Sequence, residues 1–159
     1  MVVSEFTHID GDGSVRMVDV SGKPVTAREA VAAGEIEMAA STLNQVTEGT
    51  TPKGNVLETA RIAAIMAAKR TSDLIPLCHP IAVTGVDVAC DVRADRIVLQ
   101  ATVRVPDRTG VEMEALAAVS VGLLTIYDMC KAVDRDMRIG NIRLLRKAGG
   151  RTGTYVRTE

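Results

Sequence analysis

The chain has 159 residues, enough for one domain with a substantial core, and its formal net charge of -1 provides no overall field that would attract nucleic acid or an anionic membrane. With two tyrosines, one phenylalanine and no tryptophan, it also lacks the aromatic side chains on which single-stranded nucleic acid stacks. We therefore expect neither nucleic acid nor a membrane as partner, and a core built from aliphatic side chains and methionine.

The N-terminal sequence and the cysteines indicate the compartment. No basic segment followed by an apolar one resembles a signal peptide, and no apolar run approaches the ~20 residues of a membrane span. Cys78, Cys90 and Cys130 form no CxxC motif and leave an odd thiol, so a disulfide framework is not expected. The sequence thus predicts a cytoplasmic protein with reduced cysteines.

The first part of the chain divides at about residue 24. Residues 1–24 are polar and glycine-rich, which is typical of an arm, and residues 25–159 form the single expected domain. Within residues 26–46 the alanine and glutamate content favours a helix, although Gly34 interrupts the segment and no apolar stripe is present. Residues 48–54 are rich in Gly, Thr and Pro and predict a loop.

The rest of the chain predicts a regular order of elements. Residues 56–70 form an alanine-rich helix that must pack closely, and the alternating segments 86–92 and 97–105 form a β-hairpin. A long helix follows at 112–133, and a final strand at 137–146. With one more strand before the first helix, this order gives an α+β fold of the ferredoxin-like, split βαβ type, with an antiparallel sheet and helices on one face.

The long helix carries apolar residues on every side. A core stripe follows helical spacing: Leu116, Val119, Leu123, Ile126, Cys130 and Val133. Other faces also carry apolar side chains: Ala117, Ala118, Val121 and Leu124. A helix that is apolar all round in so short a chain predicts a partner subunit.

Asp128 and Lys131 are three residues apart on this helix, and their spacing fits two interpretations. A surface ion pair between them explains the pattern by itself. Apolar neighbours such as Val121 and Leu124 would instead desolvate the pair in part, and desolvation moves pKa values toward the range that catalysis uses. Both interpretations stay open from spacing alone.

Glu112 and Glu114 open the same helix, where the helix dipole favours carboxylates and explains their presence. Glu114 and Asp128 lie within about 40° of each other around the helix but about 21 Å apart along it. One small reacting centre can therefore contact both only when the ligand is long or a second chain supplies one of them.

Two further segments carry cations. Lys53 lies in the polar loop, where a free surface lysine is the ordinary interpretation. Residues 146–153 combine three cations with three glycines, a composition that can present backbone N–H groups to phosphate. The spacing of a nucleotide-binding P-loop is missing, so this second signal is weak by itself.

Cys78 and His79 stand side by side between two prolines, and this pattern fits three roles. A zinc site needs further ligands, and His8 is the only other histidine. A nucleophile with its base is also disfavoured, because adjacent residues of an extended chain point to opposite sides. The remaining role is a rigid wall of a pocket, without a metal.

Three long motifs carry a family resemblance. They are Lys-Arg-Thr-Ser-Asp-Leu-Ile-Pro-Leu-Cys-His-Pro at 69–80, Gly-Val-Glu-Met-Glu-Ala-Leu at 110–116 and Leu-Thr-Ile-Tyr-Asp-Met-Cys-Lys-Ala at 124–132. In this order they strongly resemble the molybdenum cofactor biosynthesis protein C family, the cyclic pyranopterin monophosphate synthases. The resemblance runs over residues 7–153.

The resemblance implies a reaction and an assembly. The reaction converts (8S)-3′,8-cyclo-7,8-dihydroguanosine 5′-triphosphate, which a radical cyclase makes from GTP, into cyclic pyranopterin monophosphate and diphosphate, with no cofactor in the chain. The assembly is a homohexamer, a trimer of dimers, with active sites between subunits. The resemblance also implies an edge strand within residues 26–38, against the helix that composition favours.

The resemblance implies roles for particular residues. Asp128 matches the position of the family's catalytic acid/base, and Lys131 and Lys53 match positions beside the reacting triphosphate. The substrate-binding positions carried over are Leu77, Cys78, His79, Glu112, Met113, Glu114, Arg28 and Lys147. The alternative from another class is a non-catalytic ferredoxin-like module that binds a small anion, which gives no reason for Asp128 in an apolar helix.

Overall fold

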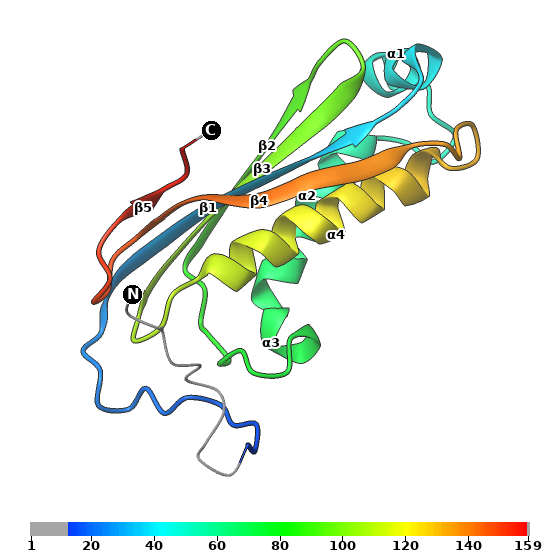
Figure 1. The fold of residues 1–159 in the computed structure, drawn as a ribbon. Helices are drawn as coiled ribbons and strands as arrows, with labels where there is room; N and C mark the ends of the chain where they lie inside the picture. Colours follow the sequence, from blue (N-terminus) through cyan, green and yellow to red (C-terminus); the bar gives the residue numbers. More distant parts are fainter. Residues whose placement is uncertain (1–12, 159) are drawn as a thin grey trace.

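The structure, a computed structural model, describes residues 13–158 and consists of an antiparallel sheet covered on one face by helices (Figure 1). Within these residues the sheet has five strands in the order β2-β3-β1-β4-β5. The strands are β1 (Thr26–Glu37), β2 (Gly85–Val92), β3 (Arg96–Asp107), β4 (Arg138–Ala148) and β5 (Tyr155–Val156).

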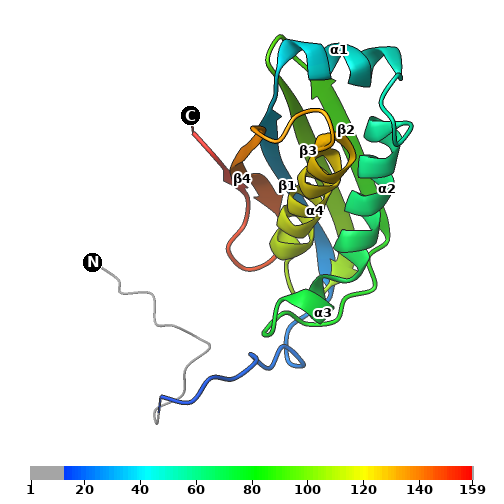
Figure 2. The ribbon, with the colours of Figure 1, turned by 90° about the vertical axis from the view of Figure 1, so that its right-hand side faces the viewer.

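Two long helices, α2 and α4, lie against the same face of the sheet, as the side view shows (Figure 2). The helices are α1 (Ala40–Glu48), α2 (Val56–Lys69), α3 (Thr71–Leu74) and α4 (Glu112–Cys130). The order β1, helix, β2, β3, α4, β4 with β1 between β3 and β4 is the ferredoxin-like arrangement. The predicted fold class is therefore confirmed.

β1 differs from both predictions made for its segment. It pairs along its whole length with β3 on one side and from Glu29 to Glu37 with β4 on the other, so it is an interior strand. The helix that composition favoured for residues 26–46 is wrong over β1 and holds only from Ala40 onward, where α1 begins. The edge strand that the resemblance implied is wrong. Ala30, Ala32 and Ile36 alternate toward the helices and are fully buried, because this strand crosses the middle of the core.

The small residues of α2 allow it to approach α4 closely. Ala60 and Ala64 are fully buried where α2 passes Gly122 of α4. A methyl group added at Gly122 would lie 3.3 Å from the Cβ atom of Ala64 and 2.6 Å from Cδ1 of Leu99. The close packing predicted from the alanine content is thus present in the contact between the two helices.

The core stripe predicted for α4 holds for most of its length. Val119, Leu123 and Ile126 are fully buried, and Cys130 is nearly so. Val133 is the exception, because the helix ends at Cys130 and leaves this side chain 45% exposed. Leu124, on another face, is exposed as well, so the described chain leaves part of the apolar surface of α4 uncovered.

By length and composition α4 could also cross a membrane, and it is the only such helix within residues 13–158. Half of its apolar stretch of 18 residues is buried inside the protein, against α2 and the sheet. A helix with these contacts is typical of the core of a folded domain.

Gly34 stands where β1 and β4 change register. The pairing shifts between Ala33 and Glu35, so that two residues of β4, Asn141 and Ile142, stand opposite Gly34 alone. Asn141 has a positive φ of 53°. Such an extra residue is a β-bulge. A Cβ atom at Gly34 would lie 2.8–2.9 Å from side-chain atoms of Leu123, Ile142 and Val119.

We expect Gly34→Ala to lower the free energy of unfolding by about 1–3 kcal/mol, because three packed side chains must move to admit the methyl group. Urea titration followed by circular dichroism measures this change. Gly140→Ala is the matched control, since a methyl group there meets nothing within 4 Å. Equal stability of the two variants would contradict the packing argument.

Candidate active site

The three residues predicted as catalytic meet at the C-terminal end of α4. Lys53, from the loop between α1 and α2, donates hydrogen bonds to Oδ2 of Asp128 at 2.8 Å and to its backbone oxygen at 2.9 Å. Nζ of Lys131 lies 2.7 Å from the other carboxylate oxygen, Oδ1. Each oxygen of one carboxylate therefore holds one ammonium group.

These two cations fix the charge state of Asp128. The hydrogen bond from Lys131, followed by that from Lys53, lowers the pKa of Asp128 to about 2. The side chain is 55% exposed, so the partial desolvation expected from its apolar neighbours is wrong for the described chain. Asp128 is consequently ionised at neutral pH and a weaker base than an ordinary carboxylate, and it holds two lysines in place.

Six of the predicted substrate-binding residues meet at the other end of α4. These six residues line one cavity: Leu77, Cys78, His79, Glu112, Met113 and Glu114. Val18, Val20 and Lys23, from the segment before β1, line the same cavity. The motif at 69–80 supplies one wall and the start of α4 the other. The segment predicted as an arm thus contributes side chains to this cavity.

The Cys78-His79 pair is part of this wall. Nε2 of His79 lies 2.6 Å from the backbone oxygen of Val18, and because a carbonyl oxygen only accepts, Nε2 carries the proton. Burial, followed by the nearby Glu114 carboxylate, raises the pKa of the Cys78 thiol. The thiol is therefore protonated at neutral pH, which disfavours a nucleophilic role.

Glu114 is the buried carboxyl group of the cavity, with only 3% of the residue exposed. Burial is the main cause that raises the pKa of Glu114 to about 7, and the carboxylates of Glu112 and Asp107 add to the effect. A carboxyl group with this pKa exchanges its proton near neutral pH, which suits general acid and base catalysis.

The raised pKa predicts how stability depends on pH. Between about pH 4.5 and pH 7 the unfolded chain releases the Glu114 proton while the folded chain keeps it, so the folded state loses stability as pH rises. We expect Glu114→Gln to remove this loss. The unfolding free energy of the variant minus that of wild type should therefore rise by on the order of 2–3 kcal/mol from about pH 4.5 to about pH 8.

Urea titrations of wild type and variant at these two pH values measure the gain. The control is Glu48→Gln at the exposed end of α1, which should give the same difference at both. A Glu114→Gln difference that does not change with pH would contradict the raised pKa.

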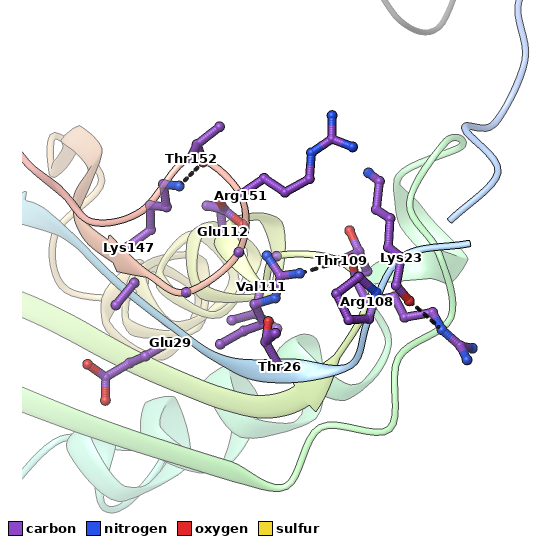
Figure 3. Close-up of a pocket in the computed structure, with 16 residues that line it drawn as sticks. Lys23, Thr26, Glu29, Arg108, Thr109, Val111, Glu112, Lys147, Arg151 and Thr152 are labelled. Atoms are coloured by element: carbon purple, nitrogen blue, oxygen red, sulfur yellow. Dashed lines mark hydrogen bonds between the residues drawn. The ribbon is translucent and has the colours of Figure 1, made fainter. Parts of the chain in front are cut away.

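Arg28 and Lys147 lie in a neighbouring cavity of about 490 Å³ (Figure 3). Arg28 donates to the backbone oxygens of Asp107 at 3.3 Å and Arg108 at 3.1 Å, so it fastens the loop before α4. Lys147 donates to the hydroxyl group of Thr152. Four residues line both cavities, which are therefore adjacent: Lys23, Thr109, Gly110 and Glu112.

Sequence reasoning missed three cations of this second cavity: Lys23, Arg108 and Arg151. Lys23 and Arg108 stand in short polar segments beside glycines, a pattern too common to single them out. Arg151 belongs to the glycine-rich segment 146–153, whose composition was the available signal.

The structure does not bring all predicted residues together in one chain. Asp128 and its two lysines lie at one end of α4, whereas Glu112, Met113 and Glu114 lie in its first turn. Fourteen residues of helix place Glu114 and Asp128 about 21 Å apart along the helix axis.

Within residues 13–158, no three His, Cys, Asp or Glu side chains gather in a way that could hold a metal ion. His8, weighed above as a metal ligand, lies outside the described residues.

Comparison with known proteins decides the family. The family described as the MoaC family matches residues 17–150. The chain belongs to the MoaC family. It is 59% identical to the cyclic pyranopterin monophosphate synthase of Roseiflexus sp. (strain RS-1), over 97% of this chain and 99% of that protein. It is 57% identical to the protein of the same name from Parvibaculum lavamentivorans, over 98% of each.

A third relative, cyclic pyranopterin monophosphate synthase 3 of Mycobacterium bovis, is 58% identical over 97% of this MoaC chain and 88% of its own length. The residues matched to the family begin at Met17 and so include Val18, Val20 and Lys23, which line the cavity beside Glu114. The predicted family resemblance is confirmed.

Proposed function

We propose that this MoaC chain is a cyclic pyranopterin monophosphate synthase of molybdenum cofactor biosynthesis. It converts (8S)-3′,8-cyclo-7,8-dihydroguanosine 5′-triphosphate into cyclic pyranopterin monophosphate and releases diphosphate. The observation that carries the proposal is the near full-length similarity to proteins of that name. A non-catalytic anion-binding module has less support, because those relatives are named as enzymes.

The reaction opens the five-membered ring of the purine, closes a pterin ring and drives a hydroxyl group onto the α-phosphate as diphosphate leaves. Lys53 and Lys131 supply positive charge where phosphoryl charge develops, and Asp128 keeps both ammonium groups in place and accepts protons. Glu114 has the pKa to give and take protons on the ring. These roles fit the residues carried over from the family motifs.

We further infer that the working protein is a cytoplasmic homohexamer, a trimer of dimers, with each active site between two subunits. The separation of the two groups along α4 supports a shared site, because a second chain can place its Glu114 beside the Asp128 of the first. The uncovered Leu124 on α4 supports an interface. A radical GTP cyclase supplies the substrate.

A direct assay tests the activity. Purified protein is incubated with the cyclised GTP intermediate, and released diphosphate and the pterin product are measured. We expect both products in equal amounts. Lys53→Met, which keeps an apolar stem but removes the ammonium group, should give little of either. No diphosphate above the enzyme-free blank from the wild-type protein would overturn the proposal.

A further inference from the structure

The glycine-rich hairpin after β4 contains a cationic residue, Arg151, to which no sequence motif assigned a role. Gly149, Gly150 and Gly153 all have positive φ values, of 92°, 79° and 65°, so they bend the chain back toward β5. This bend places Arg151 and Thr152 on the rim of the cavity that contains Lys147 (Figure 3).

The position of the hairpin is set by close packing on β1. A Cβ atom at Gly149 would collide with the backbone oxygen of Ala27, and one at Gly150 would collide with the guanidinium group of Arg28. Only glycine allows both the approach and the backbone conformation. The hydrogen bond from Lys147 to Thr152 closes the hairpin from inside. The backbone at Arg151 is therefore held at a defined place.

The cavity itself is positively charged. Among its described lining residues, five carry cationic side chains and two carry carboxylates: Lys23, Arg28, Arg108, Lys147 and Arg151, against Glu29 and Glu112. Glu29 is already paired with Arg104 and Arg146 on the sheet. The excess of positive charge favours a ligand that carries several negative charges.

Three of these cations already have a partner, whereas Lys23 and Arg151 have none among the described residues. Arg28 holds two backbone oxygens, Arg108 donates to the backbone oxygen of Lys23 at 3.0 Å, and Lys147 donates to Thr152. Among the described residues the side chains of Lys23 and Arg151 have no hydrogen-bond or ionic partner, and both extend away from the strands in Figure 3.

A second polar group in the cavity is also unsatisfied. The hydroxyl oxygen of Thr26, at the start of β1, is buried and has no hydrogen-bond partner among the described residues. Buried hydroxyl groups in proteins normally have a partner. A phosphate oxygen inside this positively charged cavity would accept a hydrogen bond from the Thr26 hydroxyl group.

We propose that Arg151 is a substrate-positioning residue that binds the phosphate chain of the triphosphate substrate at the mouth of this cavity. The inference rests on the proposed function for the identity of the substrate, and on the proposed shared site, in which a second chain brings its Lys53 and Lys131 to the same phosphates. The adjacent cavity, which shares Thr109 and Glu112, then holds the base and sugar. Guanidinium groups suit this role, because they bind phosphate oxygens through two parallel hydrogen bonds.

The test compares Arg151→Gln with wild type in the diphosphate-release assay and in competition by inorganic triphosphate. We expect KM and the inhibition constant of triphosphate each to rise roughly ten- to a hundredfold, with kcat within about twofold, because a charge-assisted hydrogen bond to bound phosphate is lost. Arg151→Lys should restore part of the affinity. Arg93→Gln, at the exposed turn between β2 and β3, is the matched control and should behave as wild type.

The outcomes separate this inference from the proposed function. An Arg151→Gln protein with unchanged KM and unchanged triphosphate inhibition overturns the role of Arg151, while the synthase activity of the wild type stands. A fall in kcat alone, with both constants unchanged, also overturns it, because a binding residue acts on affinity. A wild-type protein that makes no product overturns the proposed function. The affinities of the wild-type and Arg151→Gln proteins for inorganic triphosphate then test the phosphate site at Arg151 independently.

Discussion

An Asp128→Asn variant is expected to turn over the cyclised GTP intermediate roughly 10²–10⁴ times more slowly than wild type, the usual range for loss of a general acid or base. Asparagine keeps the size of the side chain but loses the charge that holds Lys53 and Lys131 at 2.8 and 2.7 Å. Single-turnover measurements of diphosphate release give the rate, and circular dichroism shows whether the fold is kept.

Asp91→Asn is the control for this experiment, because Asp91 is also exposed and paired with one cation, Arg93, but lies on β2. It should leave the rate unchanged. A near-normal rate for Asp128→Asn would mean that the carboxylate is only one member of a surface ion-pair cluster.

Mixing two inactive variants is expected to restore activity. When Asp128→Asn subunits exchange with Glu114→Ala subunits in equal amounts, about a quarter of all sites should regain both wild-type residues, if each site takes the two residues from different chains of a two-fold symmetric pair. Each variant alone has no intact site. The expected signal is therefore a rise from a very low rate to about a quarter of the wild-type rate.

Subunit exchange is verified by mass spectrometry of differently labelled chains before the assay. Mixing Asp128→Asn with Lys53→Met is the control, because these two residues contact each other within one chain and no mixed site should be intact. No recovery in the first mixture, despite proven exchange, would count against the shared site.

The local and periodic features of this protein could be predicted from the sequence. In the β2–β3 hairpin apolar residues largely alternate with polar or small ones, and α2 and α4 follow their composition and apolar spacing, so the predicted types and order of these elements are correct. The family resemblance that long motifs carry also implied one site for Cys78, His79 and Glu114, and the structure puts them in one cavity.

The errors concern properties that depend on distant parts of the chain. β1 has the alanine and glutamate content of a helix, and only its pairing with β3 and β4 makes it an interior strand. The exposure of Asp128 likewise depends on what covers α4. Its contact with Lys53 joins residues 75 positions apart, which no local spacing predicts.

The length of α4 limits where this protein can gain or lose residues. One inserted residue between Glu114 and Asp128 would turn one end of the helix by about 100° against the other and lengthen it by about 1.5 Å. Glu114 would then leave its cavity, or Asp128 would leave its lysines. Natural variation in chain length is consequently tolerable in exposed connections such as the turn between β2 and β3, while the spacing between these two acidic residues must stay fixed at fourteen.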